Sequence, residues 1–310
     1  MKKKIIKKIN KNDNFIILPH KSPDGDCIGS ANALHEALKL LNKRSYIIIE
    51  DEIPSNLEFL DIKTYTIEEF DQLNVNSNIV ITLDSSDKCR FDKRVKYLEK
   101  NFIINIDHHK TNTNYGDLNY VKKFSSVGEI LYNLFVDMDI NFNKTISNSL
   151  YTSISSDTGS FKYSNTSSKT LLIASKLRDK VDFELINTEL YQNQKFEKVI
   201  LRNKIFETLK IYKDKIGIVY LTKSMKNDLN LKEFNTDGIV EQVRNIEGVS
   251  VSIFVKEKDQ GLLKVSLRSK YDIDVAKIAF KFNGGGHKKA AGFESDLDIK
   301  KIINKLVDII

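Results

Sequence analysis

The chain has 310 residues, of which 41% are hydrophobic and 29% are charged, and its formal net charge is +7. This composition is typical of a soluble globular protein that is long enough to form two domains. The basic balance suits an anionic ligand such as phosphate or short nucleic acid, but a solvated basic surface explains it equally well.

The N-terminus starts with Met1 and three lysines but lacks the apolar core and cleavage site of a secretory signal. No run approaches the roughly 18 apolar residues that span a bilayer. Cys27 and Cys89 lack CxxC spacing, so we expect free thiols in a reducing compartment. These features predict a cytoplasmic protein without membrane association.

Short apolar runs alternate with helical patterns in the first half of the chain. The runs lack polar alternation, as is typical of parallel strands covered on both faces, and they lie at 15–18, 46–49, 78–83 and 102–106. Helical spacing of apolar residues is clearest over 28–41 and 127–135. This alternation predicts a doubly wound α/β domain with a mainly parallel sheet, whose ligands bind at the carboxyl ends of the strands.

The second half of the chain changes character after residue 169. Residues 169–209 are mostly helical in pattern, and the rest predicts strands at 217–221, 249–256 and 262–268 with helices at 273–282 and 299–309. We therefore predict an α/β domain over 1–185, a helical connector over 186–210, and a smaller C-terminal α/β domain over 211–310.

Acidic and imidazole side chains follow several of the apolar segments. These are His20, Asp24, Asp26, Asp84, Asp107, His108, His109 and, at the end of a helical pattern, Asp157. Buried carboxylates and imidazoles are costly unless they are paired or bind metal. Together they predict one site, formed by several strand ends, that holds hard cations such as Mn²⁺ or Mg²⁺.

An alternative for the first of these segments is that Asp24 and Asp26 cap the following helix. That segment alone leaves the two interpretations evenly balanced. The distribution of the five histidines favours a site, because only His35 lies within an ordinary helical pattern. We expect His35 to serve the surface or the packing.

A glycine-rich segment, Gly284, Gly285 and Gly286 followed by His287, lies between two helical patterns near the C-terminus. Its backbone N–H groups could approach an anion closely, although a flexible turn after a helix also explains the glycines. His287 and the upstream Arg268 and Ser269 favour an anion-binding segment.

These residues resemble the motifs of the DHH phosphoesterases. His20-x-x-x-Asp24-x-Asp26, Asp84, Asp107-His108-His109 and Asp157 match the four motifs of that family in order. The glycine-rich segment matches the DHH-associated C-terminal domain. The chain length and the sequence Asp157-Thr158-Gly159-Ser160-Phe161 look most like the stand-alone oligoribonuclease/pAp phosphatase branch.

The resemblance implies two Mn²⁺ ions, for which Mg²⁺ or Co²⁺ could substitute. His20, Asp24 and Asp84 would hold one ion, and the second would be held by Asp26, Asp84, His108 and Asp157, with Asp84 bridging. Asp107 would orient a ligand histidine, and His109 would touch the scissile phosphate or the leaving group. The substrate-binding residues, across a cleft between the domains, would be Arg268, Ser269, Gly284, Gly285, Gly286 and His287.

The implied activity is hydrolysis of short single-stranded RNA (nano-RNA) to mononucleotides and of pAp to AMP, through two-metal activation of water. The nearest alternative is a phosphodiesterase for cyclic di-AMP or pApA with the same residues. An inorganic pyrophosphatase and a non-catalytic RNA-binding regulator are less favoured. The role of Arg90 and the oligomeric state stay open, with a homodimer as one option.

Overall fold

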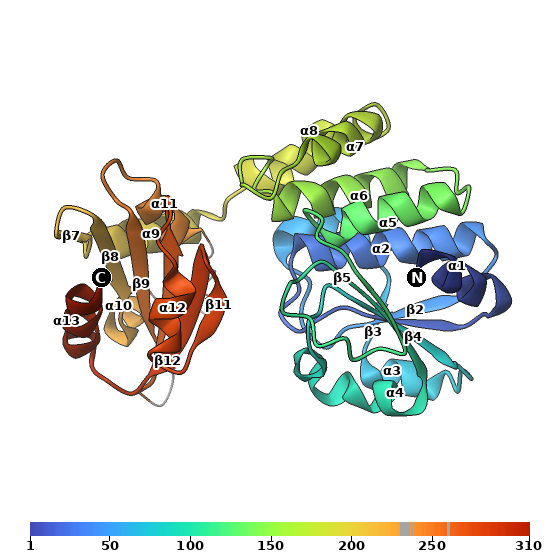
Figure 1. The fold of residues 1–310 in the computed structure, drawn as a ribbon, viewed down its shortest axis with the longest axis horizontal. Helices are drawn as coiled ribbons and strands as arrows, with labels where there is room; N and C mark the ends of the chain where they lie inside the picture. The colour runs from blue at the N-terminus through green and yellow to red at the C-terminus, as the bar shows by residue number, and fades with distance from the viewer. Residues whose placement is uncertain (230–235, 237, 259–260) are drawn as a thin grey trace. The chain divides into compact units, whose positions relative to one another are not determined.

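Figure 1 shows the fold as a computed structural model, which describes residues 1–229, 236, 238–258 and 261–310. The chain divides into two compact units, Met1–Asn193 and Gln194–Ile310. The segment expected as a connector is shared between them. The first unit includes α8 (Phe183–Asn187) and the π-helical turn η3 (Thr188–Gln192), and the second begins with α9 (Phe196–Phe206).

The first unit contains six parallel strands in the order β3-β2-β1-β4-β5-β6. They are β1 (Phe15–Leu18), β2 (Ser45–Ile48), β3 (Thr64–Tyr65), β4 (Ile79–Leu83), β5 (Phe102–Asp107) and β6 (Leu118–Val121). The order runs outward from β1 to β3 and then continues from the other side of β1. The resulting switch point between β1 and β4 is where open α/β sheets bind ligands. The predicted parallel α/β sheet is confirmed, and the sequence analysis missed only its two edge strands, β3 and β6.

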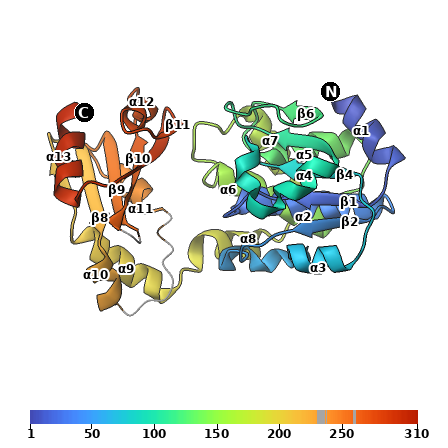
Figure 2. The same ribbon diagram turned by 90° about the horizontal axis from the view of Figure 1, so that it is seen from below.

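Helices cover both faces of this sheet (Figure 1 and Figure 2). One face carries α1 (Lys2–Lys11), α2 (Gly25–Leu40), α5 (Val127–Asp137) and α6 (Lys144–Asp157), with α7 (Ser168–Arg178) against α6. The other face carries α3 (Ile67–Gln72), α4 (Lys96–Lys100) and the 3₁₀ segment η2 (Lys88–Val95). Ile17 packs in the core on the first face, and Ile16 and Leu18 in the core on the second. Burial on both sides explains why the strands are continuously hydrophobic.

Small residues bring α2 very close to α6. A Cβ atom on Gly29 would lie 2.5 Å from the carbonyl oxygen of Ser149 and 3.0 Å from the backbone nitrogen of Ser153. The backbones of the two helices therefore touch, which requires glycine at position 29. Because α2 and α6 each carry a predicted site residue, Asp26 and Asp157, this contact also sets the spacing of the site.

The second unit contains a mixed sheet in the order β11-β12-β10-β9-β8-β7, in which only β8 and β9 are parallel among the described pairs. The strands are β7 (Lys210–Tyr212), β8 (Ile216–Leu221), β9 (Val251–Glu257), β10 (Leu263–Ser269), β11 (Gly285–His287) and β12 (Ala290–Ser295). The other helices are α10 (Lys223–Asp228), α11 (Ile239–Arg244), α12 (Val275–Phe280) and α13 (Ile299–Ile309). Two apolar cores lie on the two faces of this sheet, one with α12 and α13 and one with α9 and α11. None of the helices in the described ranges is long and apolar enough to cross a membrane.

The glycine-rich segment forms a strand and not the flexible turn after a helix that was its alternative interpretation. Gly285–His287 forms the edge strand β11, which pairs antiparallel with β12. Gly286 has a φ of +138°, and a Cβ atom there would lie 2.5 Å from the carbonyl oxygen of Ala290. The tight hairpin, rather than a loose loop, requires glycine at this position.

We expect Gly29→Ala to destabilise the protein by about 1–3 kcal/mol, because the added methyl group forces α2 away from α6. Urea unfolding followed by circular dichroism measures this effect. Gly285→Ala is the matched control, since a Cβ atom at Gly285 would meet nothing within 4 Å. Equal losses in both variants would contradict the close helix contact.

Candidate metal centre

Asp24 is the N-cap residue of α2. Its Oδ1 accepts hydrogen bonds from the backbone N–H groups of Asp26 and Cys27, both at 3.1 Å. These contacts satisfy two of the free amides at the start of the helix. Within the described residues, Asp24 belongs to none of the groups whose potential ligand atoms converge within 4.8 Å. Its part in metal binding therefore stays a prediction, whereas its capping role is observed.

Asp26 points into the packed helices instead of capping α2. Its carboxylate is 1% exposed and accepts hydrogen bonds from the backbone N–H of Val127 at 2.8 Å and from Ser153 Oγ at 2.5 Å. Val127 starts α5, so the negative charge lies at the positive end of that helix dipole. Contacts from two other helices therefore fix the Asp26 carboxylate.

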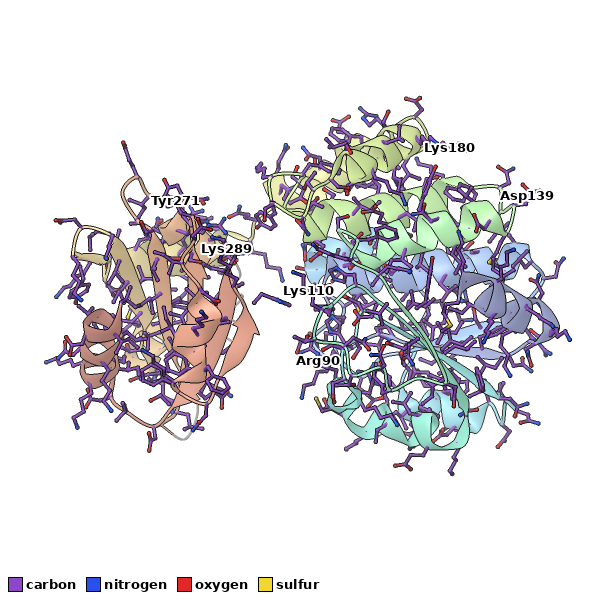
Figure 3. All side chains as sticks on the ribbon, in the orientation of Figure 1. Arg90, Lys110, Asp139, Lys180, Tyr271 and Lys289 are labelled. Carbon is purple, nitrogen blue, oxygen red and sulfur yellow. The ribbon has the colours of Figure 1, made fainter. Side chains whose placement is uncertain are left out.

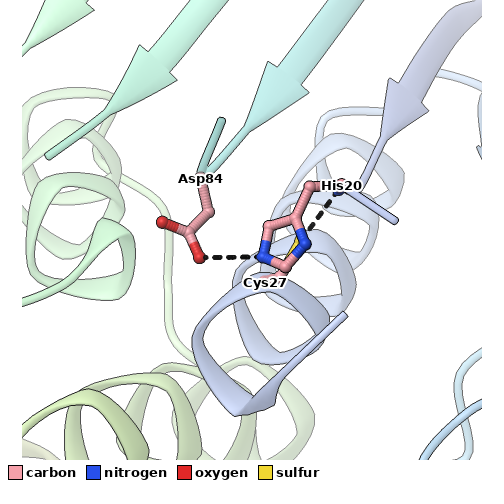
Figure 4. A group of neighbouring side chains, drawn as sticks. All are labelled: His20, Cys27 and Asp84. Atoms are coloured by element: carbon pink, nitrogen blue, oxygen red, sulfur yellow. Dashed lines mark hydrogen bonds and ion pairs between the residues drawn. The ribbon is translucent and has the colours of Figure 1, made fainter. Parts of the chain in front are cut away.

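Asp84 lies at the switch point, directly after β4. Its Oδ2 is 3.5 Å from His20 Nε2 (Figure 4), and its Oδ1 is 3.3 Å from His108 Nε2. The side chain is 4% exposed, and Oδ1 accepts no hydrogen bond from any residue that the structure describes. A buried carboxylate oxygen without a donor is costly, and a bound cation would satisfy it.

Asp107 is fully buried at the end of β5 and orients the two histidines that follow it. Its Oδ1 accepts hydrogen bonds from the backbone N–H of His108 and from His109 Nδ1, both at 2.8 Å. Its contact with an imidazole ring is therefore with His109, while it holds His108 through the backbone. The other oxygen, Oδ2, accepts a hydrogen bond from Asn112 Nδ2 at 2.5 Å.

His108 connects the remaining predicted ligands. Its Nε2 lies 3.7 Å from Asp26 Oδ2 and 3.8 Å from Asp157 Oδ2, the latter at the end of α6. Its Nδ1 lies 3.3 Å from the carbonyl oxygen of Phe124. A proton on Nδ1 fits this acceptor and leaves the Nε2 lone pair for a cation.

Three overlapping groups of potential ligands result from this arrangement. They are His20, Cys27 and Asp84; Asp84, His108 and His109; and Asp26, His108 and Asp157. Cys27, in the first turn of α2, was not among the predicted site residues, because without CxxC spacing it was expected to be a free thiol. Its buried sulfur accepts a hydrogen bond from the His20 backbone N–H at 3.2 Å (Figure 4), and burial raises the pKa of the thiol well above its usual range. A neutral thiol in this place positions His20.

The carboxylates that crowd the centre favour the binding of positive charge. Burial alone would lower the pKa of His108, but Asp84 and the neighbouring carboxylates outweigh it and raise that pKa to about 11. Burial and nearby carboxylates raise the pKa of Asp157 to about 6. Both shifts favour the protonated form where negative charges crowd together. Divalent cations would replace these protons, and carboxylate and imidazole donors fit such ions.

Asp107 belongs to a buried hydrogen-bond network with Asn112, Asn105 and Tyr115. Besides Asp107, Asn112 Nδ2 donates to Asn105 Oδ1 at 2.8 Å and to the carbonyl oxygen of Ser85 at 3.2 Å. Asn105 in turn donates to the hydroxyl of Tyr115 at 2.9 Å. The network ties the loops after β4 and β5 to each other, and the sequence patterns did not reveal it.

The predicted substrate-binding residues all lie in the second unit. Arg268 Nε donates to Glu241 Oε1 on α11 at 2.8 Å, and the Ser269 hydroxyl donates to the carbonyl oxygen of Ile273 at 2.7 Å. Ser269 is therefore already used to close a turn. His287 is exposed in β11, next to the three glycines.

We expect Asn112→Ala to lower the affinity for a divalent cation, or the turnover, by about 10- to 100-fold, because Asp107 loses the donor that fixes it. Calorimetric titration with Mn²⁺ measures the affinity. Asn101→Ala is the control, since Asn101 bonds the Tyr97 carbonyl oxygen just before β5, at the opposite end of that strand. An equal loss in the control would contradict a specific effect on the centre.

Comparisons with known proteins agree with this geometry. The N-terminal domain of the DHH family matches residues 14–154, and the DHHA1 domain matches residues 216–310. A probable bifunctional oligoribonuclease and PAP phosphatase NrnA of Streptococcus mutans is 32% identical over 94% of this chain and 93% of its own length. The bifunctional oligoribonuclease and PAP phosphatase NrnA of Thermus thermophilus is 29% identical over 95% and 88%.

Among solved structures, an exopolyphosphatase-related protein of Bacteroides fragilis superposes with a TM-score of 0.90 at 26% identity, covering 99% of this chain and 95% of that one. The two family domains match the two units of the structure in order. The chain therefore belongs to the DHH family, whose phosphoesterases depend on metal ions.

Proposed function

We propose that this protein hydrolyses short single-stranded RNA to mononucleotides and removes the 3′-phosphate of pAp to give AMP. The observation that carries the proposal is the overlap of three ligand groups through Asp84 and His108 at the switch point of the sheet. Overlapping groups of this kind suit two neighbouring cations that bind one phosphate between them. The names of the relatives in Streptococcus mutans and Thermus thermophilus support the choice of substrates.

Mn²⁺ is the proposed ion, with Mg²⁺ or Co²⁺ able to replace it, because oxygen and imidazole donors predominate. His20, Asp24 and Asp84 would hold one ion. The second would be held by Asp26, Asp84, His108 and Asp157. When bound, such a pair lowers the pKa of a water molecule and neutralises charge on the phosphate.

His109 is the proposed proton donor to the leaving group. Burial alone would lower the pKa of its imidazole, but Asp107 and Asp84 outweigh this effect and raise that pKa. The hydrogen bond to Asp107 keeps a proton on Nδ1, so the donated proton comes from Nε2. Asp107 acts as a positioning residue, since its carboxylate fixes the His109 ring.

The second unit would bind the phosphate or base at the far end of a short substrate. Arg268 and His287 carry the proposed contacts, because a guanidinium and an imidazole both suit phosphate. Glu241 already orients the Arg268 guanidinium through Nε. Gly284 and Gly286 shape this segment through close backbone packing against β12, and Ser269 shapes it through a turn.

The test is to incubate the Mn²⁺-loaded protein with an RNA length series, pAp, pApA, cyclic di-AMP and pyrophosphate, and to resolve the products. We expect mononucleotides from the shortest RNAs and AMP from pAp. Release of pApA from cyclic di-AMP at a comparable rate would instead assign the protein to second-messenger hydrolysis. Turnover of pyrophosphate alone would exclude both activities.

Asp84→Asn should abolish turnover of every substrate in this series, because it removes the carboxylate that all of the proposed chemistry shares. Asp139→Asn is the matched control: Asp139 is exposed (Figure 3) and has a φ of +57°, close to the +55° of Asp84. Full activity in Asp84→Asn would refute the proposed centre.

A further inference from the structure

Arg90 lies beside the predicted metal ligand His20 but has not been assigned a role. It belongs to η2 after β4 and is half-buried, and Figure 3 labels its side chain. Its carbonyl oxygen accepts a hydrogen bond from the backbone N–H of Lys21 at 2.8 Å, which fixes the residue next to His20. Its guanidinium Nη2 lies 2.9 Å from His20 Nδ1 and 3.4 Å from the carbonyl oxygen of Lys21.

Among the described residues, Arg90 lacks the carboxylate partner that three of the six other arginines of the chain have. Arg44, Arg94 and Arg268 lie 2.7, 4.0 and 2.8 Å from an aspartate or glutamate oxygen. In the described part of the chain, no carboxylate forms an ion pair with Arg90. A guanidinium at the edge of a phosphate-processing centre, without an internal anion, is available to an anionic ligand.

The two polar groups nearest to His20 Nδ1 require opposite protonation of that nitrogen. Arg90 Nη2 can only donate, so its contact requires a lone pair on Nδ1. The carbonyl oxygen of Lys21, 2.8 Å from the same nitrogen, can only accept, so it requires a proton there. A neutral imidazole carries one proton, and it can satisfy only one of these neighbours at a time.

A cation bound to His20 Nε2 would determine which of these two hydrogen bonds Nδ1 makes. It would take the Nε2 lone pair and place the proton on Nδ1, where it bonds to the Lys21 carbonyl oxygen. Arg90 would then face an N–H group instead of an acceptor, and its contact with His20 would become unfavourable. Since its backbone is fixed at Lys21, only the side chain is free to turn away.

We propose that Arg90 binds the phosphate of the substrate, and that it is released from His20 for this role when a cation occupies His20 Nε2. This inference rests on the proposed phosphoesterase function. It implies that the metal and the phosphate bind with positive coupling, because the first removes the internal partner of the guanidinium that receives the second. It further implies that Arg90 opposes metal binding slightly in the free protein.

The test compares wild type, Arg90→Ala and Arg90→Lys by calorimetry, first with Mn²⁺ and then with inorganic phosphate, with and without Mn²⁺. In the presence of Mn²⁺, we expect Arg90→Ala to weaken phosphate binding by about 10- to 100-fold, the loss expected for a charged hydrogen bond. Its affinity for Mn²⁺ should be unchanged or higher.

Two further variants serve as controls. Arg90→Lys should recover part of the phosphate affinity, because it keeps the positive charge but loses the planar guanidinium that can donate two hydrogen bonds to one phosphate. Lys88→Ala, on the same η2 segment and exposed, removes an equal charge and should change neither affinity.

Two outcomes would overturn the inference. Wild-type phosphate affinity in Mn²⁺-loaded Arg90→Ala would show that Arg90 does not bind phosphate. An equal loss of Mn²⁺ and phosphate affinity would show that Arg90 merely supports His20. Hydrolysis of pAp and RNA by the wild type tests the proposed function separately. Failure of that assay with the expected binding changes would leave the role of Arg90 intact and remove only the substrate assignment.

Discussion

Mutual repulsion among three carboxylates is the constraint on which the rest of the first unit depends. Asp26, Asp84 and Asp157 surround the imidazole of His108 at distances of 3.3 to 3.8 Å. In a poorly solvated place such negative charges must be balanced by protons or by cations. The carboxylates raise the pKa of His108 to about 11, and burial with the nearby charges raises the pKa of Asp157 to about 6, as expected where negative charges crowd together. The fold therefore maintains an arrangement that favours cations.

A close helix contact and a hydrogen-bond network hold these side chains in place. Close contact of α2 and α6 at Gly29 sets the distance between the helices that carry Asp26 and Asp157. The network from Asp107 through Asn112 to Asn105 fixes the loops after β4 and β5. Such supporting contacts matter because small displacements of a ligand greatly weaken a metal site.

The second unit differs from the first in the kinds of polar groups that it presents. Its sheet is mostly antiparallel, and its glycine-rich edge strand presents backbone and the exposed His287 instead of buried carboxylates. Arg268 is oriented by Glu241, whereas Arg90 in the first unit has no carboxylate partner among the described residues. In the proposed function, anion recognition by guanidinium and backbone would complement cation binding by carboxylates within one chain.

The sequence by itself determined the parallel sheet, since only strands buried on both faces read as continuous apolar runs such as 15–18 and 102–106. It also predicted which polar residues gather, because the carboxyl ends of parallel strands meet at one edge. Tertiary structure decided what spacing along the chain cannot encode. It turned the glycine-rich segment into an edge strand, and it brought Cys27, Asn112 and Arg90 to the centre. The physical reason is that packing sets the directions of these contacts, which do not follow from local periodicity. Arg90 meets His20 across 70 residues of sequence, and Asn112 meets Ser85 across 27.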